Sequence, residues 1–299
     1  PIVFVRTPNA NGQSKVSDVI AAADWIIANK AQYNIRVANF SLGRADVTNP
    51  LYDPLNHAVE RLWFNDVVVV TSAGNHGSDL GPVKIKSPGN DPFVITAGAV
   101  DTLGTPSTLD DVVPSWSANG HSVAGFAKPD VAAPGRYMVG PVPLLGTLAT
   151  IKPERVLSPG YMWMSGTSFS SAIVAGAAAQ LLARHPDWSP DQVKGALMLK
   201  ATSLAGQAFK AGVGEIDVAA SAALTSPPNP NVNLYAFVVG SAGARSFDAA
   251  AWKTHVAANP TWTSAAFTES AWSESAWSES AWSESAWSES AWSESAWIE

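Results

Sequence analysis

The chain has 299 residues, of which 46% are apolar and 14% charged, so it can bury a large core and is not disordered as a whole. Its basic residues form no cluster that would bind nucleic acid, and its unbroken apolar runs fall far short of the roughly 20 residues that span a bilayer. The absence of cysteine excludes disulfides, thiol chemistry and Cys-ligated zinc.

The net charge of −7 belongs to one end of the chain. Residues 262–299 contain seven of the 25 acidic residues and no Lys or Arg, so the first 261 residues hold 18 charges of each sign and are neutral. Seven of the 13 tryptophans fall in the same tail. Composition therefore divides the chain into a neutral body and an acidic, Trp-rich tail.

The first hundred residues alternate between short strands and helices. Residues 2–5 read as a buried strand and 9–14 as a turn, after which Ser17 is the expected N-cap of a helix with apolar residues at helical spacing. A strand over 36–40, a helix over 55–63 and strands over 67–71 and 93–99 follow. This alternation predicts an α/β fold with right-handed crossovers, in which helices cover both faces of a parallel sheet.

Two further helices are expected over 170–184 and 190–202. Ser189 and Gln192 form a capping box around Pro190 at the start of the second one. The Pro- and Asn-rich cluster at 225–230 predicts that the folded pattern ends there. The expected organisation is a domain over 1–224, a linker or extension over 225–261 and a repeat tail over 262–299.

Five segments carry the functional signal, and the first two end at the carboxyl ends of predicted strands, where ligands bind in such sheets. They read VANFSLG (37–43), VVVVTSAGN (67–75), VITAGAVD (94–101), KPDVAAPG (128–135) and SGTSFSSAIVAGAAAQLL (165–182). In order and spacing, from about residue 2 to residue 222, the chain resembles the subtilisin-like serine peptidases. The resemblance implies that fold, endopeptidase activity on a polypeptide substrate and an extracellular location, with calcium as a candidate cofactor for which the sequence offers no complete ligand set.

The resemblance makes Ser168 the nucleophile. A serine at the start of a buried helix also lies where free backbone N–H groups and the positive helix end favour a developing oxyanion. The small residues Ala172, Ala175, Gly176 and Ala179 are expected to bring that helix close to the sheet. The structural alternative is that Ser168 only caps the helix.

Asn75 matches the side chain with which the family stabilises the oxyanion, and its alternative role is that of a turn residue. The two segments Ser41, Leu42, Gly43 and Ser72, Ala73, Gly74 resemble the edges of the substrate cleft, where an extended peptide could pair with exposed backbone; ordinary strand ends are the alternative. Asp130 is given no catalytic role, and His76, although near Asn75, is expected to be a loop residue.

A serine hydroxyl is a weak nucleophile until a base accepts its proton. The family's aspartate and its His-Gly-Thr-His type motif do not occur in the 299 residues, and Ala172 and Ile173 replace a usual proline and histidine. We therefore expect a fragment truncated at its N-terminus, lacking an interior strand, poorly folded and inactive when expressed alone. A non-catalytic peptide-binding remnant is the alternative.

The tail repeats Glu-Ser-Ala-Trp-Ser from Glu269. A five-residue period places no single apolar stripe on a helix, and on a strand it alternates faces. A flexible extension is one interpretation. The other is docking of the tryptophans on the catalytic body, on another copy or on a cell surface, which would make the chain a surface-attachment protein.

Overall fold

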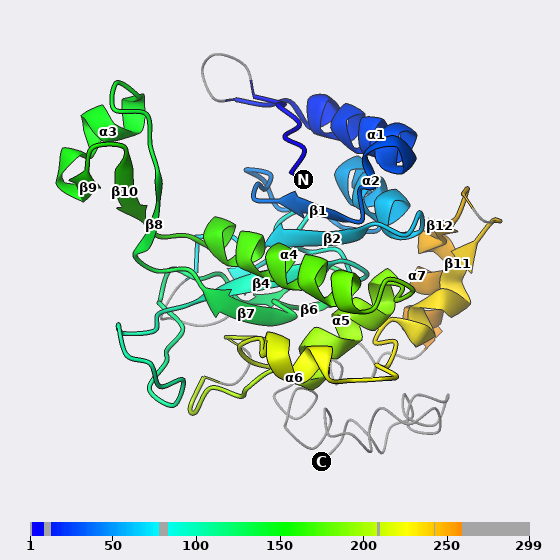
Figure 1. Cartoon of the computed structure of the whole chain (residues 1–299). Helices are drawn as coiled ribbons and strands as arrows, with labels where there is room; N and C mark the ends of the chain where they lie inside the picture. The colour runs from blue at the N-terminus through cyan, green and yellow to red at the C-terminus, as the bar shows by residue number, and fades with distance from the viewer. Residues whose placement is uncertain (1, 9–12, 78–82, 208–209, 242, 259–299) are drawn as a thin grey trace.

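A four-stranded parallel sheet lies at the centre of the computed structural model, which describes residues 2–8, 13–77, 83–207, 210–241 and 243–258 (Figure 1). The strand order is β1-β2-β4-β7. The register pairs Phe40 with Thr71 and Ser72 with Ala97, so β1 and β2 end at the same edge of the sheet. The strands are β1 (Val37–Phe40), β2 (Val68–Ser72), β4 (Ile95–Val100) and β7 (Val131–Pro134).

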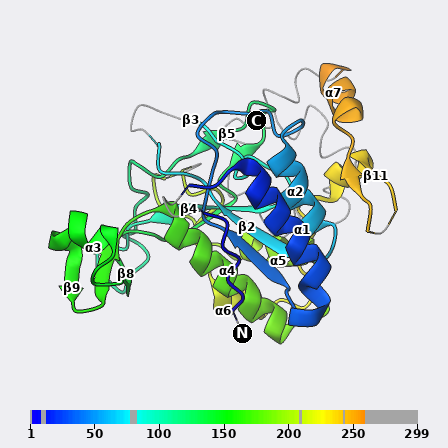
Figure 2. The same cartoon turned by 90° about the horizontal axis from the view of Figure 1, so that it is seen from above.

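Helices cover both faces of this sheet, as the sequence predicted. In both Figure 1 and Figure 2, β2 lies between α2 and α4. On one side, α1 packs on α2 and α2 on β2, while α4 packs along all four strands from the other side. These helices are α1 (Val16–Tyr33), α2 (Pro54–Trp63) and α4 (Thr167–Arg184).

Burial of β-branched and small residues makes the sheet a core element. All five residues of β2 and all six of β4 are buried, as parallel strands covered on both faces require. Between the strands, α2 begins at the Asp53 N-cap, whose side chain accepts a hydrogen bond from Leu55 N. The α5 helix (Pro190–Leu199) begins with the predicted capping box, since Ser189 and Gln192 bond to each other's backbone N–H.

The expected strand over residues 2–5 is wrong. Residues 2–8 have no regular structure, and the side chains of Ile2 and Phe4 are 98% and 84% exposed. A strand is stable only with a neighbour to accept its hydrogen bonds, and β1 is the edge of the described sheet. The helix that follows also starts earlier than predicted, at Val16, because the Asp18 carboxylate accepts from Lys15 N.

The face that α4 turns to the sheet differs from the prediction. The small residues Ala172, Gly176 and Ala179 are exposed and Ala175 is half-buried. The buried face is offset from them and contains the larger Val174, Leu181 and Leu182 with small polar and Ala residues. Both sets follow helical spacing, so periodicity alone does not select between them.

An arm protrudes from the body between β7 and α4, and we define it as residues 137–164 (Figure 1, green). Its antiparallel sheet has the order β8-β10-β9 and encloses a small cluster of Val142, Ala149 and Met162. Two bonds close its base, from Gly166 N to Gly135 O (2.9 Å) and from Tyr137 N to Ser165 Oγ (3.0 Å). Its elements are β8 (Met138–Pro141), α3 (Thr147–Ile151), η1 (Pro153–Arg155), β9 (Val156–Ser158) and β10 (Tyr161–Met164).

The folded body does not end at residues 225–230. The segment 231–258, which we call the C-terminal extension, buries Leu234, Phe247 and Trp252 in the main core. The predicted linker was inferred from Pro and Asn residues that here make a turn between packed elements. The extension holds η2 (Val232–Phe237), β11 (Val238–Val239), β12 (Ser246–Phe247) and α7 (Ala249–Ala258), and it follows α6 (Val218–Ala222).

A second small sheet, β3-β5-β6, completes the body. It contains β3 (Val83–Lys84), β5 (Gly120–His121) and β6 (Ala127–Lys128). No helix among the described residues is both long and apolar enough to cross a membrane. The pentapeptide tail over 262–299 lies outside the described residues.

Candidate active site

Ser168 is the second residue of α4, at the carboxyl edge of the sheet. Its side chain is half-buried, and none of the described residues forms a hydrogen bond with its Oγ. The first N–H groups of a helix have no partner within the helix, and an 18-residue helix adds a positive partial charge there. The position is therefore suited to an anion.

Thr167, which directly precedes Ser168, holds the Asn75 side chain in place. Asn75 Oδ1 accepts hydrogen bonds from Thr167 N (2.9 Å) and Thr167 Oγ1 (3.0 Å), and Thr167 Oγ1 in turn accepts from Gly74 N (3.1 Å). Because Oδ1 accepts both bonds from Thr167, the Nδ2 donor at the other end of the Asn75 carboxamide points away from Thr167. A Cβ at Gly166 would lie 3.1 Å from Nδ2, so the glycine leaves room for the amide.

Ser41 ties the end of β1 to the first turn of α4. Its Oγ donates to Ser168 O (2.8 Å), lies 2.9 Å from Ser171 Oγ and accepts from Asn39 Nδ2 (2.8 Å). Ser171 Oγ donates to the same Ser168 carbonyl at 3.0 Å. Two hydroxyls thus hold the backbone of Ser168, and Ser41 positions this residue besides lying on the rim.

The two predicted cleft edges, 41–43 and 72–74, lie at the ends of the neighbouring strands β1 and β2. Ser41 and Gly43 are exposed and Leu42 is half-buried, whereas Ser72 and Ala73 are buried and Gly74 is half-buried with a φ of +109°. Ala73 N donates to Ala97 O and Gly74 O accepts from Ala118 N, so this second segment is held within the body. The segment 41–43 is the more open of the two.

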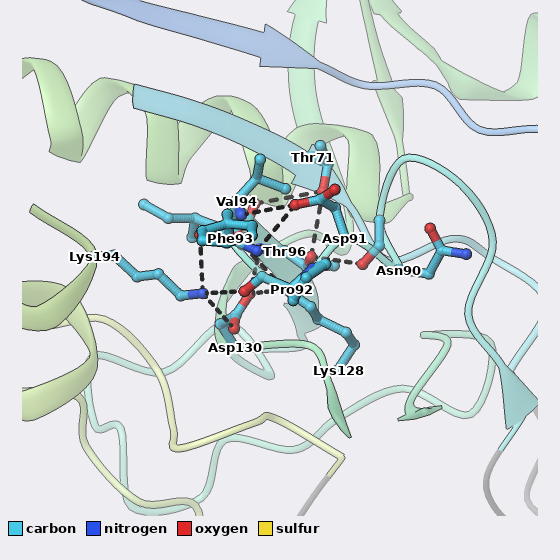
Figure 3. A network of polar contacts seen from close by, with 12 residues as sticks. Thr71, Asn90, Asp91, Pro92, Phe93, Val94, Thr96, Lys128, Asp130 and Lys194 are labelled. Atoms are coloured by element: carbon cyan, nitrogen blue, oxygen red, sulfur yellow. Dashed lines mark hydrogen bonds and ion pairs between the residues drawn. The ribbon is translucent and has the colours of Figure 1, made fainter. Parts of the chain in front are cut away.

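Neither His76 nor Asp130 contacts Ser168. The His76 ring lies against Gly74, and its Nε2 is 3.3 Å from Lys84 O. Asp130 belongs to the buried network of Figure 3, where its carboxylate accepts from Thr96 N (2.7 Å) and pairs with Lys128 Nζ (2.7 Å) and Lys194 Nζ (3.3 Å). These contacts hold β4, β7 and α5 together.

The same network contains a buried pair of carboxyl groups. Glu60 on α2 is 2% exposed and is hydrogen-bonded to Asp91, which is fully buried and also accepts from Phe93 N and Asn56 Nδ2. Burial raises the pKa of Glu60 to about 8. Burial and the neighbouring Glu60 carboxyl raise the pKa of Asp91 as well. The pair therefore retains a proton at neutral pH.

A hollow of about 320 Å³ opens next to Asn75, where the arm meets the body. Its lining includes Asn75, Arg136, Tyr137, Arg155, Trp163 and Ser165. The sequence prediction missed these arm residues, because an Arg or Trp within a Pro- and Gly-rich stretch carries no periodic signal. It also missed Thr167, although a hydroxyl directly before Ser168 was visible in the string 165–168. Among the described residues, no group of three or more His, Asp or Glu side chains could hold a metal ion.

Comparison with known proteins decides the family. A sequence profile of the subtilase family matches residues 1–215. The chain belongs to the subtilase family. It is 36% identical over 204 residues to the serine protease AprX of Bacillus subtilis, and 31% identical over 218 residues to subtilisin DY of Bacillus licheniformis. These matches cover 64% and 73% of the chain.

The chain spans 44% of the length of AprX and 66% of subtilisin DY. Among solved structures, the subtilase fold is shared with sphericase, at a TM-score of 0.56 and 22% identity, over 71% of this chain and 66% of that one. Fervidolysin from Fervidobacterium pennivorans, described as a keratinolytic enzyme, has a TM-score of 0.55 and 24% identity over 73% of this chain and 30% of its own. These structures support the predicted fold.

Proposed function

We propose that this subtilase contributes the nucleophile and oxyanion hole of a serine endopeptidase that hydrolyses peptide bonds outside the cell. Ser168 Oγ attacks the carbonyl carbon of the scissile bond, and the resulting oxyanion accepts hydrogen bonds from Asn75 Nδ2 and Ser168 N–H. The acyl-enzyme forms as the amine leaves, and water then releases the new carboxylate. The observation that carries this proposal is the grip of Thr167 on Asn75 Oδ1, which leaves Nδ2 available beside α4.

The proton acceptor for Ser168 comes, in this proposal, from a histidine outside these 299 residues, oriented by an aspartate also outside them. Two open surfaces beside Ser168 could seat such a segment. One is the edge of β1 that has no neighbouring strand among the described residues. The other is the exposed face of α4, where Ala172, Gly176 and Ala179 allow close approach. Nothing among the described residues competes for Ser168 Oγ.

The substrate would lie along residues 41–43 and 72–74 as an added strand. Ser41 and Gly43 are exposed and Gly74 has no side chain, so the backbone there is accessible to a peptide. Calcium is not part of the proposal.

The test is cleavage by the complete protein, prepared from its complete gene, and by its Ser168→Ala variant. We expect hydrolysis of an unstructured protein substrate such as casein, and its loss in the variant. In-frame Asp-Thr-Gly and His-Gly-Thr-His type motifs in the DNA before the codon for Pro1 would supply the base. Hydrolysis that persists in Ser168→Ala would reject Ser168 as the nucleophile, and absence of any hydrolysis by the parent would favour a peptide-binding remnant instead.

A further inference from the structure

The hollow beside Asn75 brings two arginines and three aromatic residues, Trp116, Tyr137 and Trp163, close to the proposed oxyanion position. Asn75 and Ser165 belong to the body, while Tyr137, Arg155 and Trp163 belong to the arm and Arg136 directly precedes it. The Tyr137 and Trp163 rings meet edge to face with centroids 5.0 Å apart. We call this site the arginine hollow. None of the proposed catalytic steps uses its arginines.

Arg155 stacks on an aromatic ring, and one of its hydrogen-bond donors, Nε, has no acceptor among the described residues. Its guanidinium carbon lies 4.7 Å from the centre of the Trp163 ring, so the cation stacks on the aromatic face. Its Nε is buried and has no hydrogen-bond partner among the described residues. The carboxylate beside it, Glu154 Oε1, is 3.7 Å from Nε and belongs to an exposed side chain. A buried donor left in this way favours an acceptor supplied by a ligand.

Arg136 differs, because its charge is already paired. Its Nη1 donates to Asp101 Oδ2 at 2.7 Å, and its guanidinium carbon lies 4.9 Å from the centre of the Tyr137 ring. Asp101 is buried, so it neutralises Arg136 within the wall of the hollow. The positive charge without a buried counter-ion therefore comes from Arg155, whose ion-pair partner in the described part of the chain is the exposed Glu154.

We propose that the arginine hollow binds a carboxylate of the peptide substrate close to the scissile bond, and that Arg155 makes the protein select acidic peptides. The proposal rests on the proposed function, since the hollow shares Asn75 with the oxyanion position. A guanidinium is planar and can pair with both oxygens of a carboxylate. The rings of Tyr137 and Trp163 would contact the methylene groups of a glutamate side chain. The body as a whole is neutral, so this preference would be local.

The experiment measures binding without cleavage. The complete protein carrying Ser168→Ala is titrated into fluorescein-labelled Ala/Gly peptides with one Glu at successive positions, and into the same peptides with Gln, and anisotropy gives Kd. We expect Glu at one position to bind at least about tenfold more tightly than Gln. Arg155→Gln should remove the difference, and Arg155→Lys should restore only part of it. The control Arg184→Gln, at the far end of α4, should keep it.

A second pair of peptides distinguishes the two sources of a carboxylate, an acidic side chain and the C-terminus of a peptide. One ends in a free carboxylate near the scissile position and the other ends in an amide, and neither contains an acidic side chain. Preference for the free end alone would assign the hollow to chain termini.

Equal binding of Glu and Gln peptides, no binding of either, or a preference that survives Arg155→Gln would overturn the proposal. An equal loss for both peptides in Arg155→Gln, with Arg155→Lys unable to restore the preference, would also overturn it, because it indicates a structural role. Cleavage by the Ser168 parent is scored separately. A carboxylate preference without cleavage would leave this inference standing and reject the proposed function.

Discussion

Asn75 and Thr167 are joined by two hydrogen bonds that fix which end of the Asn75 carboxamide can act. With Oδ1 accepting from Thr167 N and Oγ1, only the Nδ2 donors remain for an oxyanion. The resemblance of Asn75 and Ser168 to family motifs predicted these two residues. The role of Thr167 follows only from the geometry, because a threonine at the first position of a helix is common for many reasons.

Replacing Thr167 by valine tests this arrangement. The change removes the Oγ1 contacts with Asn75 and Gly74 but keeps the side-chain shape and the Thr167 N–H bond. We expect kcat of the complete protein to fall about tenfold with KM little changed, since the lost interaction acts on the transition state. Asn75→Ala should lower kcat further, by about 10²–10³-fold, as loss of an oxyanion-hole asparagine does in a subtilisin.

Steady-state kinetics on a peptide substrate gives both values. Thr254→Val, on the exposed side of α7, is the matched control and should retain full activity. Unchanged kcat in Thr167→Val would show that the backbone bond alone orients Asn75.

Glu60 is the residue whose ionisation should shape the pH dependence of stability. Its folded pKa of about 8 lies above the ordinary value of about 4.3, so the folded state keeps a proton that the unfolded chain has released. The stabilisation is fully present below about pH 4.3 and is lost as pH rises to about 8, by up to about 1.4 kcal/mol per pH unit.

Glu60→Gln keeps the shape and needs no proton. We expect the Tm of this variant of the complete protein to fall less between pH 5 and pH 8 than that of the parent, and to exceed it at pH 8. Glu154→Gln, an exposed change, should follow the parent. Parallel pH profiles for parent and Glu60→Gln would contradict the shifted pKa.

At the scale of elements, the C-terminal extension is anchored by a single buried carboxylate on α5. Asp191 accepts hydrogen bonds from Trp63 Nε1 (3.0 Å), Asn231 Nδ2 (2.7 Å) and Tyr235 Oη (2.6 Å). These bonds join α2, α5 and the extension. Lys194 Nζ adds a contact to Asn231 Oδ1 at 3.2 Å.

Tyr235→Phe removes one of these bonds and leaves an oxygen of Asp191 without that donor. We expect the complete protein to lose about 1–3 kcal/mol of stability, measured by denaturant unfolding. Tyr52→Phe is the control, because Tyr52 is 57% exposed, and it should change stability little. An unchanged midpoint in Tyr235→Phe would mean that the extension contributes nothing through this contact.

Prediction from sequence succeeded for elements that are determined by residues close together in the chain. The strands over 67–71 and 93–99 and the capping box at Ser189 were recovered because burial and capping act within a few residues. The strand at residues 2–5 and the sheet-facing side of α4 were wrong, since each depends on what lies beside it. The extension was missed because Pro and Asn indicate a turn without indicating whether the chain packs again afterwards.

At the scale of the molecule, net charge controls association between copies. The body over residues 1–261 carries 18 charges of each sign, and a neutral surface favours such association. The seven glutamates of residues 262–299 supply the net charge of −7 that opposes it.

Changing those seven glutamates to glutamine keeps the chain length and tests the effect. We expect the complete protein to self-associate at lower concentration at neutral pH, as seen by light scattering at low ionic strength, and the difference to shrink in high salt. Ser107→Thr, an exposed and uncharged change in the body, is the control and should scatter like the parent. Identical scattering of the Gln variant and the parent would show that tail charge does not limit association.

Because hydrogen bonds close the base of the arm, residues 137–164 could be replaced by another segment without disturbing the body. The bonds from Gly166 to Gly135 and from Tyr137 to Ser165 bring its two ends together independently of what lies between them. The entropy of closing a loop grows only slowly with its length, so arms of other sizes and sequences can be grafted at this point while α4 keeps its start. If the arm binds substrate as proposed, exchange of residues 137–164 would change substrate preference without rebuilding the body.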